Sequence, residues 1–221
     1  MIKQILKNIP GNAELAPYFA QIKLAKEWLN KQVLDRKIAP LNVAFQENDL
    51  EEIKNIANSV VNDFWRVVIL GVGGSSLGGK TLTAISNNSA ITVDFLESID
   101  STTISKKLKD VDLKNSFFVV ISKSGETIET ICQTLIIIEE FKKNGGRNLS
   151  DNFLFITQNE DSIIGKIAKE IRARIYYHPT DIGGRFSYLT IVGLLPAALA
   201  NLDLFGIRNG AKELLNNFLL E

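Results

Sequence analysis

Five short apolar runs, each followed by a helix-length segment, constrain the fold of this chain more than any other feature. The runs are rich in Val, Ile and Phe and lie at residues 66–72, 91–97, 116–122, 152–157 and 173–177. Strands that are apolar on both faces and separated by helices form parallel sheets with helices on both sides. The sequence therefore predicts an α/β fold with a five-stranded parallel sheet, and ligands are expected beyond the carboxyl ends of its strands.

The segments on either side of this alternation are expected to be helical. Residues 1–46 carry helical periodicity and indicate an N-terminal helical appendage, and residues 47–205 form the predicted main domain. Residues 206–221 are predicted to be a C-terminal helical tail. Within the main domain, residues 47–64 place apolar side chains three and four positions apart, which is typical of a helix that packs one stripe on a core.

Composition excludes several classes of function. Lysine plus arginine equals aspartate plus glutamate, 25 each, so no overall charge attracts nucleic acid or an anionic membrane. The single cysteine, Cys132, excludes an internal disulfide and a multi-cysteine metal site, and no metal or other cofactor is expected. The longest apolar stretch, residues 189–200, contains Pro196 and falls short of the roughly 20 residues of a membrane span. A cytoplasmic protein is expected.

The first candidate loop is GVGGSSLGGK, residues 71–80, directly after the first apolar run. Its glycines let backbone amides approach a ligand, and the next helix offers its positive N-terminal end, so the loop suits a phosphate. A tight turn without a ligand is the alternative. Gly74 to Thr81 also fits the nucleotide-binding pattern G-x-x-x-x-G-K-[ST]. That pattern needs an aspartate at a strand tip for magnesium, and the only one available, Asp94, lies inside its run.

The second loop is SKSGETIET, Ser122 to Thr130, after the most apolar run. It holds four hydroxyls within nine residues, and Ser124, Thr127 and Thr130 follow one another at the spacing of neighbours on a helix face. Hydroxyls, first-turn amides and a helix dipole could share a phosphate dianion without a full positive charge. The alternative is ordinary helix capping by Ser124 or Thr127, which would use one hydroxyl.

The third loop is DIGGRFSYLT, Asp181 to Thr190. Its two glycines let the chain pass close to a ligand, and Arg185 directly after them would lie at the entrance of the ligand site. Ser187 is expected to cap the next helix. A fixed arginine there could stabilise oxyanion charge. The alternative is a surface turn in which Arg185 pairs with Asp181.

These three loops, in this order, resemble the corresponding segments of the phosphoglucose isomerase family, from around Glu51 to about Asp203. The resemblance implies a sugar isomerase domain: a three-layer, flavodoxin-like sandwich around a five-stranded parallel sheet, with an N-terminal helical segment. It implies interconversion of glucose 6-phosphate and fructose 6-phosphate through a cis-enediol in glycolysis and gluconeogenesis, with no cofactor. The implied ligand is a small sugar phosphate.

The resemblance also implies roles for individual residues. The phosphate would be held by the first two loops, through Ser75, Ser122, the amide of Lys123, Ser124, Thr127 and Thr130. Gly74 is implied as a substrate-binding position in the first loop. Gly184 and Arg185 would lie beside the C1 and C2 oxygens, where Arg185 steadies the enediolate, and Glu129 matches an acidic position in the same pocket. His178, the only histidine, matches no catalytic position of the family, and a structural role is favoured.

Family members carry a second sugar isomerase domain that supplies the general base, a ring-opening histidine and a lysine, and the sequence ends at Glu221 before all three. The preferred hypothesis is an N-terminal half of an isomerase. It would work with a complementing C-terminal half, or in a homodimer as is usual in the family. The alternative is a sugar-phosphate-binding module without catalysis, and a nucleoside-triphosphatase is a distant third.

Overall fold

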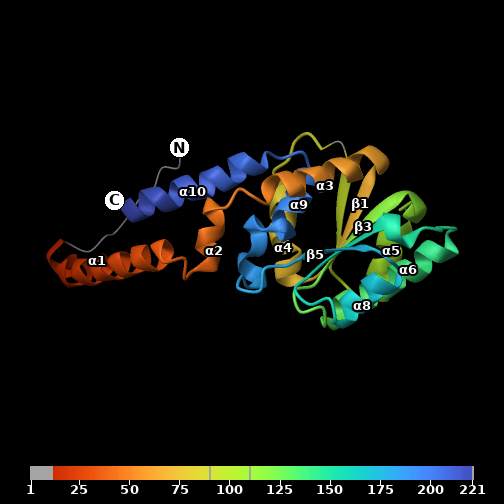
Figure 1. The fold of residues 1–221 in the computed structure, drawn as a ribbon, viewed down its shortest axis with the longest axis horizontal. Helices are drawn as coiled ribbons and strands as arrows, with labels where there is room; N and C mark the ends of the chain where they lie inside the picture. Colours follow the sequence, from red (N-terminus) through yellow and green to blue (C-terminus); the bar gives the residue numbers. More distant parts are fainter. Residues whose placement is uncertain (1–11, 90, 110, 221) are drawn as a thin grey trace.

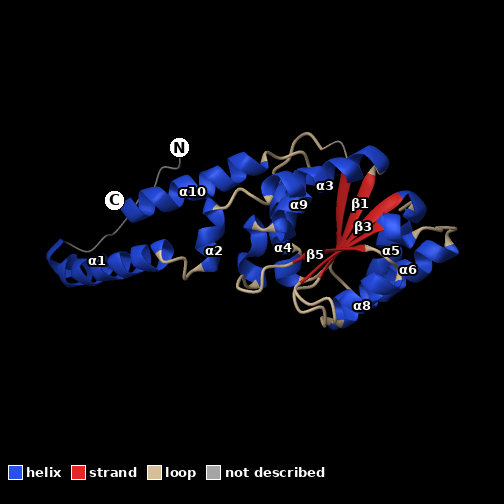
Figure 2. Cartoon of the chain, in the orientation of Figure 1, coloured by secondary structure: helices blue, strands red, loops and turns tan. Residues whose placement is uncertain are grey.

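The centre of the molecule is one parallel sheet. The computed structural model describes residues 12–89, 91–109 and 111–220. The strands are β1 Arg66–Leu70, β2 Thr92–Leu96, β3 Ser116–Ile121, β4 Phe153–Thr157 and β5 Arg174–Tyr177. They lie in the order β2-β1-β3-β4-β5, and every neighbouring pair is parallel (Figure 2). The predicted five-stranded α/β fold is therefore confirmed, and its strand order is that of flavodoxin-like sheets.

Helices cover both faces of the sheet. They are α3 Leu50–Asp63, α4 Leu77–Ala84, α5 Ser101–Lys109, α6 Ile128–Lys143, α7 Leu149–Asn152, α8 Ile163–Glu170 and α9 Ile191–Leu199. Val67 and Ile69 of β1 face the cluster formed with α3 and α9, and α4 packs on α9. Val68 and Leu70 face the cluster formed with α5, α6 and α8. Because successive side chains of a strand point to opposite faces, continuous apolar runs fill both cores.

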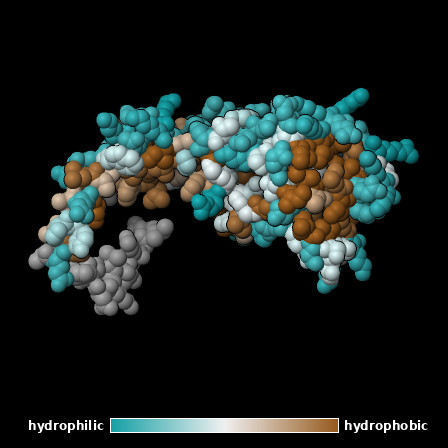
Figure 3. Space-filling view, turned by 90° about the horizontal axis from the view of Figure 1, so that it is seen from below, coloured by the Kyte–Doolittle hydropathy of each residue, from teal (hydrophilic) through white to brown (hydrophobic). Residues whose placement is uncertain are grey.

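Two long helices extend from one side of the sheet domain (Figure 1). They are α1 Asn12–Leu34 and α10 Leu204–Leu220, with α2 Ala39–Asn42 and the 3₁₀ turn η1 Val43–Phe45 linking α1 to α3. Large apolar side chains of α1 are more than half exposed: Tyr18, Phe19, Ile22, Leu24, Trp28 and Leu34. Figure 3 shows hydrophobic residues on these projecting helices and on the underside of the sheet domain. Exposed apolar area of this extent is typical of an interaction surface.

A buried arginine fixes α10 to the rest of the fold. Arg208, only 1% exposed, donates hydrogen bonds to both carboxylate oxygens of Asp49 at 2.6 and 2.9 Å. Its guanidinium also donates to the carbonyls of Gln46 at 2.7 Å and Leu189 at 2.6 Å. One side chain therefore joins α10, the start of α3 and the end of the third loop, so the first turns of α10 belong to the packed structure.

The helix after the third loop starts later than expected. Ser187 lies in the 3₁₀ segment η4 Gly184–Leu189, and α9 begins at Ile191. Thr190, not Ser187, is the N-cap, and its hydroxyl accepts a hydrogen bond from the Val192 amide at 3.3 Å. The prediction for Ser187 was wrong because its hydroxyl donates to the Gly184 carbonyl at 2.7 Å.

Among the helices of the described residues, none is both long and apolar enough to span a membrane.

Candidate functional site

The first and second loops meet where the strand order changes direction. They follow β1 and β3, which are neighbours in the sheet, while the next strand in sequence from β1 lies on its other side. A Cβ added to Gly71 would lie 3.0 Å from the Ile121 carbonyl oxygen and 3.1 Å from the Ser75 Cβ. This switch point is where sheets of this order open a crevice for ligands.

The third loop lies against the first. A Cβ added to Gly74 would come within 2.4 Å of the Gly184 carbonyl carbon and 2.8 Å of the Arg185 nitrogen, so only glycine fits there. The Ser187 hydroxyl is 3.4 Å from the Gly74 carbonyl, which strengthens the contact slightly. The structure therefore brings all three predicted loops to one edge of the sheet, and it places Gly74 and Gly184 in direct backbone contact.

The second loop keeps the N-terminus of α6 open. Thr127 stands at the N-cap, and within the described chain its side chain makes no capping hydrogen bond to α6. Its Oγ1 instead accepts from the Ser122 hydroxyl at 3.2 Å, and Ser122 Oγ accepts from the Gly125 amide at 3.1 Å. Ser124 Oγ accepts from the Glu126 amide at 3.2 Å. The capping alternative is not what the structure shows, and the first-turn amides stay available to an anion.

Two polar groups on α6 are fully buried beside this open end. Thr130 Oγ1 and Gln133 Oε1 find no hydrogen-bond partner within the part of the chain that the structure describes. The Gln133 amide nitrogen lies 3.4 Å from the Ser98 carbonyl, beyond the end of β2. Unpaired buried polar atoms are costly and are typical of sites that hold a ligand or water. The sequence analysis predicted Thr130 as a site residue but missed Gln133. The one sequence feature that could have indicated Gln133 is that it is a polar residue within an apolar helical segment.

The remaining predicted residues lie around the same edge. Ser75 is half-buried in the 3₁₀ turn η2 Gly73–Ser75, and Glu129 is half-buried on the first turn of α6. Arg185 is exposed, with its guanidinium carbon 5.9 Å from the centre of the Phe186 ring. Among the described residues Arg185 forms no ion pair with Asp181, so the surface-turn alternative is not supported.

The lysine and threonine of the nucleotide-binding pattern are engaged within the protein. Lys80 forms an ion pair with Glu97, and the Thr81 hydroxyl donates to the Leu77 carbonyl at 2.8 Å. Asp94 lies inside β2, as predicted, and pairs with Arg66 at 2.6 Å. A bound nucleotide would need the lysine free for its phosphates and the threonine and aspartate free for its magnesium. All three side chains are engaged within the protein instead.

Glu97 connects the edge strand to the first loop. It accepts a hydrogen bond from the buried Ser76 hydroxyl at 2.7 Å and one from Lys80. Burial alone would raise the pKa of Glu97, but the hydrogen bonds from Lys80 and Ser76 and the charges of Lys80 and Lys107 outweigh it. The pKa of this carboxyl therefore lies below its ordinary value. Glu97 is ionised at neutral pH and holds Ser76, next to Ser75, in place.

His178, directly after β5, is buried. Its Nδ1 lies 3.0 Å from the Pro179 carbonyl, so Nδ1 carries the proton of the neutral ring. Burial lowers the pKa of His178, the bond to Pro179 partly opposes this, and the charge of Lys123 lowers it further. The ring is neutral and inaccessible, which fits the structural role that the sequence favoured.

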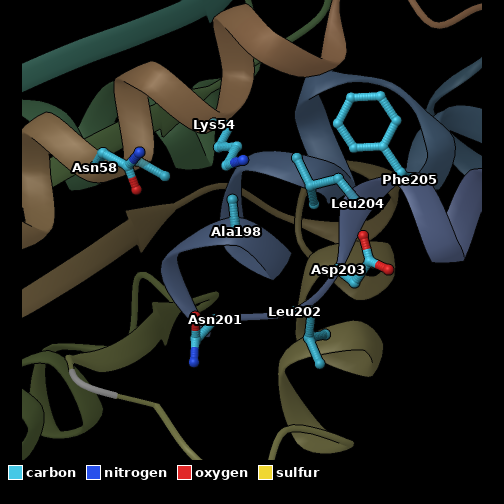
Figure 4. A pocket seen from close by; sticks show the side chains of 9 residues that line it. Lys54, Asn58, Ala198, Asn201, Leu202, Asp203, Leu204 and Phe205 are labelled. Carbon is cyan, nitrogen blue, oxygen red and sulfur yellow. The ribbon is translucent and has the colours of Figure 1, made fainter.

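A separate pocket lies beside the C-terminal end of α9 (Figure 4). Its polar side chains are Lys54 and Asn58 of α3 together with Asn201 and Asp203 of the following turn. No described residue of the three loops lines it. It is therefore distinct from the three loops at the carboxyl ends of the strands.

The strand order and the three loops at the switch point define an α/β domain of the sugar isomerase type, and similar solved structures agree on this fold. A hypothetical protein from Thermus thermophilus matches with a TM-score of 0.81 at 24% identity, over 91% of this chain and 50% of that one. A glucose-6-phosphate isomerase from Chlamydia trachomatis matches with a TM-score of 0.63 at 23% identity, over 73% and 31%. The family model of phosphoglucose isomerase matches residues 46–219, and the chain belongs to this family.

Relatives of similar sequence are glucose-6-phosphate isomerases. The one from Carboxydothermus hydrogenoformans is 33% identical over 76% of this chain and 39% of its own length. The one from Mycoplasmopsis pulmonis is 30% identical over 96% of this chain and 52% of its own length. The chain thus spans between about two fifths and a half of these two relatives. The family predicted from the three loops is confirmed.

Proposed function

We propose that this chain is the phosphate-binding, N-terminal half of a glucose-6-phosphate isomerase, which interconverts glucose 6-phosphate and fructose 6-phosphate through a cis-enediol. The observation that carries the proposal is the uncapped N-terminus of α6, which opens beside the glycine-rich first loop at the switch point. The names of its relatives supply the substrate. The chain's share of their length supports the assignment to one half.

The phosphate dianion binds at the start of α6. Hydroxyls of the first two loops donate to its oxygens, together with the Lys123 amide and the first-turn amides of α6. The hydroxyl donors are Ser75, Ser122, Ser124, Thr127 and Thr130. Thr130 supports this role because its hydroxyl is buried and, among the described residues, unpaired. The helix dipole adds about 0.3–1 kcal/mol of attraction for an anion at this position.

The reacting carbons of the sugar lie toward the third loop. Gly184 and Arg185 face the C1 and C2 oxygens, and the exposed guanidinium stabilises the enediolate as the proton moves. Glu129 lies on the same helix end as the phosphate and orients the sugar. The general base comes from elsewhere, because His178 is buried and neutral.

The base is supplied by a complementing half, because a second copy of the chain would carry the same residues and the same buried His178. The apolar side chains exposed on α1, and Leu214 and Phe218 exposed on α10, support a contact of this kind. The single cysteine supports a reducing cytoplasmic setting.

Ligand-dependent melting of the full chain tests the proposal. Glucose 6-phosphate at 100 times its Kd should raise the Tm by roughly 5–10 °C, and ATP with magnesium should not. Thr127→Val should weaken sugar-phosphate binding about tenfold, because one donor to a charged group is lost. Thr102→Val, at an exposed position of α5, is the matched control. Stabilisation by ATP with magnesium alone would overturn the proposal.

Turnover separates the enzyme half from a binding module. Without a general base, fructose 6-phosphate formation by the isolated chain should be about 10² to 10⁴-fold slower than by a complete enzyme. Addition of a complementing C-terminal half should restore the rate. Tight sugar-phosphate binding with no gain in rate on complementation would instead support the non-catalytic module.

A further inference from the structure

The side chain of Lys123 crosses from the second loop to the third. Its Nζ donates to the Thr180 carbonyl at 2.7 Å and to the Ile182 carbonyl at 2.9 Å. These carbonyls belong to the segment that leads directly into Gly184 and Arg185. The second loop is expected to hold phosphate, yet the ammonium group of its Lys123 is directed at backbone oxygens at the start of the third loop.

The sheet topology explains why a long side chain is needed here. β4 separates β3 from β5, so the loops after β3 and β5 start roughly 10 Å apart, two strand spacings. The Lys123 backbone is itself fixed to the end of β4, because its carbonyl accepts from the Gln158 amide at 3.0 Å. From this fixed point a four-carbon stem reaches the third loop, which a shorter residue would not.

The third loop is then held at both ends. Lys123 binds its start through the Thr180 and Ile182 carbonyls. From Gly184 onward it is held to the first loop by the Gly74 contact and by the Ser187 hydroxyl, 3.4 Å from the Gly74 carbonyl. The two attachments flank the residues that carry Arg185 to the crevice. Of these two attachments, the Lys123 hydrogen bonds are the one that joins the third loop to the second.

We propose that Lys123 is a positioning residue: its side chain ties the third loop to the second, and so sets where Arg185 stands relative to the phosphate-binding hydroxyls. In the proposed function its backbone amide faces the phosphate, while its ammonium group donates hydrogen bonds to the third loop. The loop attachment is independent of any ligand, and the consequence for sugar binding rests on the proposed function.

Hydrogen–deuterium exchange of the ligand-free chain tests the attachment itself. In Lys123→Met the amides of residues 180–187 should exchange about tenfold faster, because two hydrogen bonds from a charged donor are lost. Lys123→Arg, which can still donate to two carbonyls, should restore protection. Lys106→Met removes a charge from an exposed position of α5 and should change nothing. Unchanged exchange of residues 180–187 in Lys123→Met would overturn the proposal.

Binding of two probes tests the consequence for the site. Inorganic phosphate reaches only the first two loops, so its Kd should change less than about twofold in Lys123→Met, while that of fructose 6-phosphate rises about tenfold. The double variant with Arg185→Ala should bind fructose 6-phosphate no more weakly than Arg185→Ala alone.

Equal weakening of both probes would show that Lys123 acts as a direct phosphate cation, and would overturn the positioning role. If the unmodified chain binds neither probe, the proposed function is wrong, and the exchange experiment alone decides whether Lys123 holds the third loop.

Discussion

Replacing Arg208 with methionine should destabilise the whole fold. The guanidinium is 1% exposed and makes its four hydrogen bonds to Asp49, Gln46 and Leu189. Methionine keeps most of the apolar stem but leaves one carboxylate and two carbonyls without these donors. The variant therefore removes the connection between α10, the start of α3 and the end of the third loop.

The expected loss follows from the burial of the pair. Removing one partner of a buried ion pair costs about 3–5 kcal/mol. The Asp49 side chain is 33% exposed, so water recovers part of its solvation, and we expect a loss near the lower end, about 3 kcal/mol. For a domain of this size 1 kcal/mol shifts the Tm by about 2–4 °C, so the Tm of Arg208→Met should fall by roughly 6–12 °C.

Thermal and urea unfolding, followed by circular dichroism, measure this loss. Arg147→Met removes an exposed arginine and should stay within about 0.5 kcal/mol of the unmodified chain. Asp49→Asn should give an intermediate loss, because its amide oxygen still accepts one of the two hydrogen bonds. A Tm for Arg208→Met within about 2 °C of the unmodified chain would refute the reasoning.

Three further changes follow from the contacts described above. Gly74→Ala places a Cβ 2.4 Å from the Gly184 carbonyl carbon and should cost about 1–3 kcal/mol in urea unfolding, with weaker sugar-phosphate binding; an unchanged midpoint would contradict the close contact. Gly210→Ala, inside α10 with open space around the new methyl group, should gain about 0.5–1 kcal/mol, and a lower Tm would argue against it. The lowered pKa of Glu97 adds stability that is present above pH 4.5 and is lost as the pH falls below it. Glu97→Gln should therefore flatten the loss of stability between about pH 5 and 3, and an identical slope would count against the Lys80–Glu97 pairing.

The order of elements and the candidate loops could be predicted because their signals are local. Successive side chains of a strand point to opposite faces of the sheet. The continuously apolar runs at 66–72 and 116–122 therefore indicated strands buried on both faces. Glycine-rich turns after strands marked the first and third loops, and four closely spaced hydroxyls marked the second. The family resemblance rested on the same short segments, and the family model matches them.

The partner of each polar side chain could not be predicted in this way. Ser187 resembled a helix cap, and Thr127 did too, yet the first bonds Gly184 and the second accepts from Ser122. Lys80 stands where a nucleotide-binding lysine would stand, and it pairs with Glu97, directly after the end of β2. In each case the local pattern allowed several partners, and packing brought only one within reach.

By itself, then, the sequence determined the alternation of strands and helices and the three places where the chain turns at the carboxyl edge of the sheet. Only the tertiary structure decided how those turns are joined. Gly74 meets Gly184, Lys123 meets Thr180, and Arg208 meets Asp49 across 159 residues of chain. The physical reason is that periodicity is a property of neighbouring residues, whereas a hydrogen bond or a steric contact between distant residues exists only once the sheet order has placed them side by side.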